Sequence, residues 1–153
     1  MTRIRLILAA LVLALVIYLA LSALVVTDGK RVRRVIETGR RAIVNQDADR
    51  LMSLIDPTYE DDFGFNHERL RSWFEARFRS YDSIVCRIPL MSVNVDRHEA
   101  VCTLAFWFAG YQRGRRAAPA DDGAMDGLPM YQNRLVVFLN RFPEGWLIVG
   151  ASQ

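Results

Sequence analysis

The sequence predicts one α+β domain, in which three helices precede an antiparallel sheet, behind a single membrane-spanning helix. Three observations support this fold class. Residues 6–26 are apolar and uncharged, residues 28–81 repeat apolar side chains at helical spacing, and residues 83–152 alternate with a period near two. A chain of 153 residues has room for one core of modest size beyond the apolar segment.

The apolar segment Leu6–Val26 is long enough to cross a bilayer, which takes about 20 residues of helix. A cleaved signal peptide is the alternative, because Arg3 and Arg5 provide a basic start and Ala20-Leu21-Ser22 resembles a cleavage site. The apolar run exceeds the roughly 7–15 residues of a signal-peptide core. We therefore favour a retained transmembrane helix.

Residues 1–27 are accordingly predicted to be a membrane anchor, and residues 28–153 the folded domain. Basic side chains come directly after the anchor: Lys30, Arg31, Arg33 and Arg34. They favour a cytoplasmic domain by the positive-inside rule, whereas a short basic start before an apolar helix usually exports the domain behind it. We favour the extracytoplasmic, periplasmic side. The basic cluster is expected either to contact anionic headgroups or to form a solvated helix face.

The charge of the domain argues against nucleic acid as a partner. The formal charge of +3 includes the two arginines that precede the apolar segment, and the remaining basic residues nearly balance the 17 acidic ones. A nearly neutral domain lacks the basic surface that binds a polyanion.

Three helices are expected after the anchor. Asp28 is placed to cap the first helix, whose apolar positions recur every three or four residues over Val32–Ile43. Asp47 is placed to cap a second, shorter helix, which Asp56-Pro57 ends. The third helix begins near Asn66 and has a largely aromatic face.

Alternating apolar side chains predict strands in the second half of the chain. The phase slips after Met91, which indicates a β-bulge, and Asp96-Arg97-His98 forms a hairpin turn. The strand Glu99–Gln112 is apolar on both faces, so its outer face is expected to contact a second subunit or a partner protein. Residues 113–127 are expected to be a loop, followed by two strands joined at Pro143-Glu144-Gly145.

The two cysteines are expected to be free thiols. A turn at Arg97 places Cys102 opposite position 93, so Cys86 lies several residues further along the neighbouring strand. At about 3.3 Å per residue, this separation exceeds the reach of a disulfide. Neither a CxxC motif nor a cluster of Cys and His is present, so no metal ion or other cofactor is expected.

Three stretches carry a resemblance to a known superfamily: NQDADRLMSLIDPTYEDDFGFN, the hairpin around SVNVDRHEAVCTLAFWF, and the closing EGWLIVGAS. In this order they resemble the nuclear transport factor 2-like superfamily, also called SnoaL-like, over about residues 30 to 152. The resemblance implies a cone-shaped fold, with three N-terminal helices packed on a strongly curved antiparallel sheet and a pocket at the open end. It also implies frequent dimerisation through the sheet.

The resemblance implies a candidate site in the acidic stretch DPTYEDDFGFN. In the enzymes of the superfamily an Asp acts as base and a Tyr or second acid holds an oxyanion, which points to Tyr59 with Asp61 or Asp62. Further walls of a pocket that includes Tyr59 are expected from Phe63, Phe74, Phe106 and Trp107. A small apolar molecule is the expected ligand.

The same stretch also has a structural interpretation. Asp56-Pro57 stops a helix, Asn66 caps the next one, and Tyr59 can fill the rim of the cone with its hydroxyl group in water. The two histidines have no nucleophile beside them, and no second acid is evident on the later strands. We therefore favour a membrane-tethered, non-catalytic binding or assembly module with a small-ligand-sized pocket. The alternative is a small-molecule isomerase, dehydratase or hydrolase that uses Tyr59 with Asp61 or Asp62.

Overall fold

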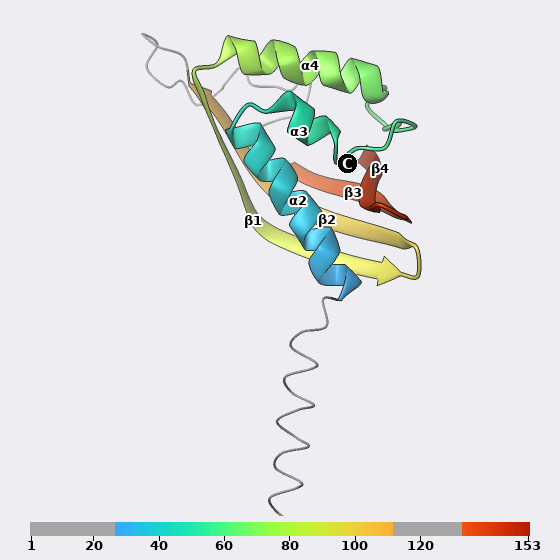
Figure 1. Cartoon of the computed structure of the whole chain (residues 1–153). Coiled ribbons are helices and arrows are strands. Elements are labelled where there is room, and N and C mark those ends of the chain that lie inside the picture. The colour runs from blue at the N-terminus through green and yellow to red at the C-terminus, as the bar shows by residue number, and fades with distance from the viewer. Residues whose placement is uncertain (1–26, 112–132) are drawn as a thin grey trace, which may run out of the picture.

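The computed structural model describes residues 27–111 and 133–153. The predicted anchor Leu6–Val26 and the predicted loop 113–127 lie outside the described residues. Within the described ranges, no helix is both long and apolar enough to cross a membrane. The described part is α+β, with helices packed against one curved antiparallel sheet, as predicted (Figure 1).

Three helices precede the sheet in the described part of the chain: α2 (Asp28–Val44), α3 (Ala48–Met52) and α4 (His67–Ser80). The side chains of Asp47 and Asn66 cap α3 and α4 by accepting hydrogen bonds from N–H groups three residues later, as predicted. The prediction that Asp28 caps α2 is wrong, because Asp28 is the first helical residue and Thr27 holds the cap position. The Asp28 carboxylate instead accepts a hydrogen bond from Arg141 at 3.2 Å.

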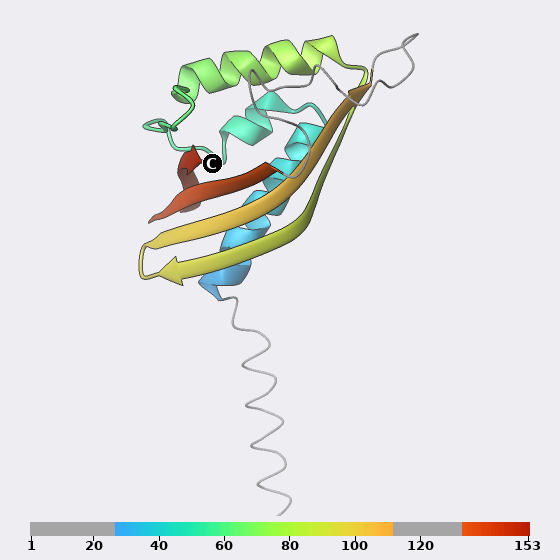
Figure 2. The same ribbon diagram turned by 180° about the vertical axis from the view of Figure 1, so that it is seen from behind.

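The strands form one sheet in chain order: β1 (Ser83–Asp96), β2 (Glu99–Tyr111), β3 (Asn133–Phe142) and β4 (Gly145–Ser152). All neighbouring strands are antiparallel. The predicted hairpin between the first two strands is confirmed, because Asp96 pairs with Glu99 and Arg97 adopts a left-handed conformation with φ of 51°. Seen from behind in Figure 2, the long strands β1 and β2 curve around the helices.

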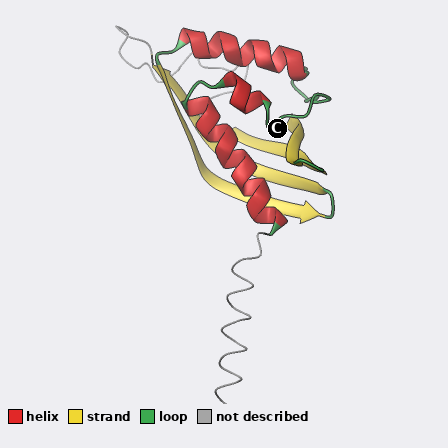
Figure 3. Cartoon of the chain, in the orientation of Figure 1, coloured by secondary structure: helices red, strands yellow, loops and turns green. Residues whose placement is uncertain are grey.

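The predicted bulge in β1 lies earlier than expected. The register shifts between Arg87 and Leu90, whereas the sequence pattern placed the slip after Met91. The cause is Pro89, which has no N–H group to donate to the neighbouring strand. A bulge bends its strand and increases its twist, which agrees with the strong curvature of β1 in Figure 3.

Both cysteines are buried and free. Cys102 lies opposite Val93, as predicted. Cys86 pairs with Phe108, further from the hairpin turn and beyond the register shift in β1. Burial raises the pKa of each thiol to about 11. Both thiols are therefore protonated and weakly nucleophilic near neutral pH.

Apolar clusters hold the helices on the concave face of the sheet. Val32 and Ile36 of α2 pack with inward-facing side chains of the sheet, including Leu139, which is 0% exposed. Leu51 of α3 and Phe78 of α4 belong to a second cluster. These contacts fix the three helices around the interior of the cone.

The segment between α3 and α4 runs along the outer edge of β4. The N–H group of Ile148 donates to Leu54 O at 2.9 Å, and the N–H group of Asp56 donates to Ile148 O at 2.8 Å. Further along, the N–H groups of Glu60 and Asp62 donate to carbonyl groups of β4. The last strand of the sheet therefore positions the acidic stretch DPTYEDDFGFN.

Candidate functional site

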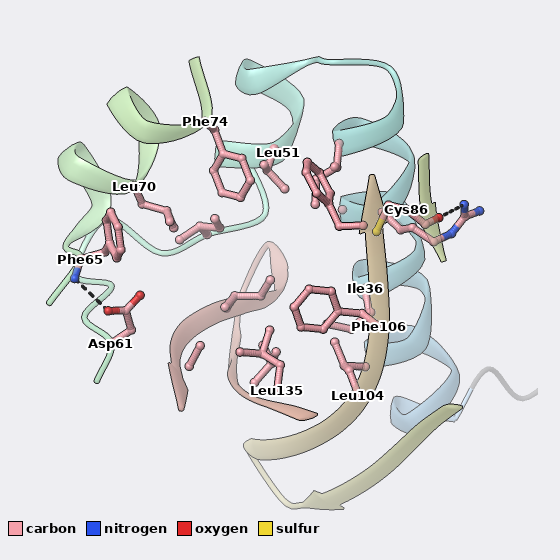
Figure 4. Close-up of a pocket in the computed structure, with 18 of the residues that line it drawn as sticks. Ile36, Leu51, Asp61, Phe65, Leu70, Phe74, Cys86, Leu104, Phe106 and Leu135 are labelled. Atoms are coloured by element: carbon pink, nitrogen blue, oxygen red, sulfur yellow. Dashed lines mark hydrogen bonds between the residues drawn. The ribbon is translucent and has the colours of Figure 1, made fainter. Parts of the chain in front are cut away.

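A cavity of about 560 Å³ lies between the helices and the concave face of the sheet (Figure 4). Its lining includes residues of all three described helices and all four described strands, and most of these side chains are aliphatic or aromatic. The aromatic residues besides Tyr59 are Phe63, Phe65, Trp73, Phe74, Phe106 and Phe108. Pockets for small molecules typically measure about 300–1,000 Å³ and are mostly apolar, so the cavity has the size and character of such a pocket.

Tyr59 and Asp61 meet at one wall of this cavity. Tyr59 is 5% exposed, and its hydroxyl group donates to Asp61 Oδ2 at 2.7 Å. Burial, assisted by the hydrogen bond to Asp61 and by the charge of that carboxylate, raises the pKa of Tyr59. The hydroxyl group therefore keeps its proton and can donate a hydrogen bond. The expectation that it lies in water at the rim is wrong, because Asp61 is its partner.

The loop after Asp61 folds back onto the carboxylate. Asp61 Oδ1 accepts hydrogen bonds from the backbone N–H groups of Phe63, at 3.0 Å, and Phe65, at 2.8 Å. Gly64, with φ of +84°, supplies the left-handed conformation of this turn. In Figure 4 the partly buried carboxylate points from the loop toward the cavity. The local sequence therefore fixes the direction of Asp61.

The other acids of the stretch do not line the cavity. Asp56 is 6% exposed and accepts hydrogen bonds from the N–H and hydroxyl groups of Thr58, so it stabilises the turn after α3. Glu60 and Asp62 are exposed. Of the two candidate partners of Tyr59, the structure brings only Asp61 to it. Asp56 and Asp61 are thus held by hydrogen bonds within the protein.

The predicted walls divide between the two faces of the sheet. Phe63, Phe74 and Phe106 line the cavity. Trp107 does not, and this expectation has to be corrected: side chains alternate along β2, so Trp107 lies on the outer face. There its ring lies 5.9 Å from the guanidinium carbon of Arg87.

Sequence reasoning missed several lining residues. Phe108 follows Phe106 at the spacing that keeps a strand side chain on one face, which is a signal that could have found it. Trp73 precedes Phe74 on α4, and Phe65 lies in the loop before this helix, so their place in the lining follows from how α4 and its loop cover the cavity. Arg40 also lines it, and its guanidinium group is bound to Glu37 at 2.9 Å.

Among the described residues, the ionisable side chains outside this cavity lack the arrangement of a metal site. Within the described ranges, no three His, Cys, Asp or Glu side chains are grouped as metal ligands. His67 and His98 do not line the cavity. The basic residues at the start of α2 are exposed: Lys30, Arg31, Arg33 and Arg34.

Comparison with known proteins identifies the fold. Neither a protein-family model nor a curated protein sequence matches the chain. A candidate aromatic ring hydroxylase from Novosphingobium aromaticivorans matches with a TM-score of 0.65 at 14% identity, over 81% of this chain and 85% of that one. A candidate dehydratase of the NTF2-like family from Streptomyces avermitilis matches with a TM-score of 0.56 at 14% identity, over 81% and 92%.

Bd1075 of Bdellovibrio bacteriovorus contains a similar domain within a longer chain. It matches with a TM-score of 0.63 at 12% identity, over 79% of this chain and 38% of Bd1075. The present chain thus spans well under two thirds of that protein. At such identities the likeness shows the fold alone. The predicted fold, three helices on a curved NTF2-like sheet, is confirmed.

Proposed function

We propose that the chain is a membrane-tethered binding module whose cone holds a small, largely apolar molecule. The observation that carries this proposal is the cavity of about 560 Å³ with its aliphatic and aromatic lining. Removing apolar surface from water drives binding to such a lining, and a few polar groups orient the ligand. Tyr59 and Asp61 are the polar groups placed to do so.

The proposed tether is the apolar segment Leu6–Val26, with the domain on the extracytoplasmic side. The exposed basic residues at the start of α2 follow this segment closely in the sequence. Side chains of this kind gain favourable energy near anionic headgroups. They are therefore proposed to hold the domain close to the membrane surface.

We also propose that the outer face of the sheet binds a second copy of the chain or a partner protein. Large apolar side chains are exposed there, and Val101 on β2 is the cross-strand partner of Phe138 on β3. Each of these two side chains is 39% exposed. Adjacent exposed apolar side chains are typical of surfaces that become covered by another protein.

Photo-cross-linking with 4-methylbenzophenone, an uncharged aromatic probe, tests whether the cavity binds a ligand. We expect the probe to insert into cavity-lining residues of the full chain in detergent, as mapped by mass spectrometry. Leu135, which lies in the cavity in Figure 4, is the residue to enlarge. Leu135→Trp is expected to reduce this labelling about ten-fold or more, because the indole ring occupies the binding space.

The matched control is Val136→Trp. Val136 neighbours Leu135 on β3 and does not line the cavity, so labelling should persist. Equal labelling of the cavity in the wild type and Leu135→Trp would overturn the proposal. Labelling confined to residues outside the cavity would overturn it as well.

A second candidate function is acid–base catalysis on the bound molecule, of the isomerase, dehydratase or hydrolase kind. The observation that favours it is the 2.7 Å hydrogen bond between Tyr59 and Asp61 at the cavity wall. A carboxylate can take the proton beside a carbonyl group, and a phenol can donate to the oxyanion that results. Candidate enzymes also occur among the solved structures that share the fold.

Elimination of water from a panel of β-hydroxy ketones tests this second function. The carboxylate takes the α-proton of the ketone and then gives a proton to the β-hydroxyl group, which leaves as water. The conjugated product is followed by ultraviolet absorbance. If Tyr59 holds the oxyanion, Tyr59→Phe should lower kcat by about 100-fold while cavity labelling by 4-methylbenzophenone persists. Rates that are equal in wild type and variant, or no acceleration with any ketone, would count against catalysis.

A further inference from the structure

We propose that the cavity selects an organic cation, namely a molecule with a largely aromatic or aliphatic body and one protonated amine that meets Asp61. The inference rests on the proposed function, which is ligand binding in the cone. It is carried by two features that lie together in one apolar cavity. One is a carboxylate without a cationic partner among the described residues, and the other is a group of aromatic rings.

No described residue balances the charge of Asp61. Its hydrogen-bond partners are the Tyr59 hydroxyl group and the N–H groups of Phe63 and Phe65, all of which are neutral donors. Both oxygens of the carboxylate thus accept hydrogen bonds from neutral groups. No described residue forms an ion pair with Asp61. A partly buried charge of this kind is stabilised when a cation joins it.

One acceptor position of Asp61 remains open to a ligand. Oδ1 accepts two hydrogen bonds and Oδ2 accepts one, whereas the two oxygens of a carboxylate offer about four lone-pair positions. The open position is on Oδ2, and Figure 4 shows the carboxylate turned toward the cavity. A single ammonium group satisfies this geometry and also neutralises the charge, which a hydroxyl group does not.

The remaining lining also favours a cation over an anion. Arg40 is the one cationic residue among the described lining residues, and its charge is balanced by Glu37 at 2.9 Å. Its Nη1 atom donates to the carbonyl oxygen of Cys86. An anionic ligand would therefore meet the uncompensated Asp61 without a free cation to offset it.

Aromatic rings stand close to Asp61 in the same lining. Phe65 donates its N–H group to Asp61, and its ring lies 6.2 Å from that of Trp73. The ring of Trp73 lies 5.0 Å from that of Phe74. The faces of such rings attract organic cations, and the guanidinium group of Arg77 already lies over the Trp73 ring, with its carbon 5.3 Å from the ring centroid. A carboxylate beside a continuous aromatic wall is thus suited to an amine with an apolar body.

Three benzophenones that share one body test this selectivity: 4-(aminomethyl)benzophenone, 4-methylbenzophenone and benzophenone-4-carboxylate. The half-saturating concentration for cavity labelling of the full chain is measured for each probe at neutral pH. We expect the amine to half-saturate labelling at a concentration about ten-fold or more below that of the neutral probe. The carboxylate should need the highest concentration. Equal values for the amine and the neutral probe would overturn the inference.

Asp61→Asn assigns the selectivity to the carboxylate, because it keeps the shape of the side chain and removes its charge. In Asp61→Asn the amine and the neutral probe should reach half-saturation at the same concentration, so that the advantage of the amine disappears even if the labelling by both probes changes. An advantage that survives in a folded variant would overturn the inference. If the variant fails to fold, labelling of the wild type by the three probes still tests whether the cavity prefers the amine. Failure of every probe to label the cavity would instead refute the proposed function.

Discussion

Replacing Leu139 with Ala is expected to lower the free energy of unfolding by about 3 kcal/mol. Leu139 is 0% exposed and belongs to the cluster that joins Val32 of α2 to Trp146 of β4. Truncation removes buried apolar atoms and leaves a void that the surrounding strands fill only in part. Urea unfolding of the full chain in mild detergent, followed by tryptophan fluorescence, measures this loss.

Phe138 provides the matched control, because it precedes Leu139 on β3 and lies on the opposite face, where it is 39% exposed. Phe138→Ala is expected to change the free energy of unfolding by less than about 1 kcal/mol. If the outer face binds a second copy, the same variant should weaken self-association in analytical ultracentrifugation. A loss of stability as large as that of Leu139→Ala would contradict the assignment of the two faces. Unchanged association would contradict a homodimer through Phe138.

Gly150→Ala is expected to destabilise the domain by about 2 kcal/mol and to weaken cavity labelling by 4-methylbenzophenone by about ten-fold. A Cβ atom on Gly150 would lie 2.8 Å from the carbonyl oxygen of Glu60, and this neighbour is backbone rather than a flexible side chain. The strand or the facing segment must therefore shift. Since Glu60 stands between Tyr59 and Asp61, the shift is transmitted to both polar groups of the cavity.

Gly29→Ala serves as the control for Gly150→Ala. Apart from its chain neighbours and its own helix backbone, no described atom lies within 4 Å of a Cβ atom built on Gly29, which is in the first turn of α2. Alanine is the better helix former, so this variant should be as stable as the wild type or slightly more stable. Thermal unfolding and cavity labelling measure both variants. Unaltered values for Gly150→Ala would show that residues 54–62 do not depend on close contact with β4.

Features set by neighbouring residues could be predicted from the sequence. The caps at Asp47 and Asn66 need only a side chain and an N–H group three residues away. The hairpin turn at Arg97 fixed which residues face each other on β1 and β2, so it also separated the two cysteines. The cap at Asp28 was predicted wrongly, because α2 begins one residue earlier than expected and Thr27 holds the cap position. The Asp28 carboxylate accepts a hydrogen bond from Arg141, a contact between residues 113 positions apart that a local pattern does not reveal.

The site could be predicted only in part. The acidic stretch identified Tyr59 and Asp61, but the pattern could not choose between Asp61 and Asp62. That choice follows from the turn at Gly64 and from the backbone hydrogen bonds to β4, which are tertiary. Whether the cone is open or filled depends on side chains from every described helix and strand. Trp107 was misplaced although the alternation of β2 assigns it to the face opposite Phe106.

The pairing of the acidic stretch with β4 determines when the cavity can form. Tyr59 and Asp61 are synthesised early, yet the strand that holds their backbone comes last in the described chain. Contacts between distant parts of a chain close slowly, and domains fold from the N-terminal side during synthesis. The nascent chain can build its helices and first hairpin while the cavity still lacks one wall. Closure of the cavity is therefore expected among the final events in the folding of this domain.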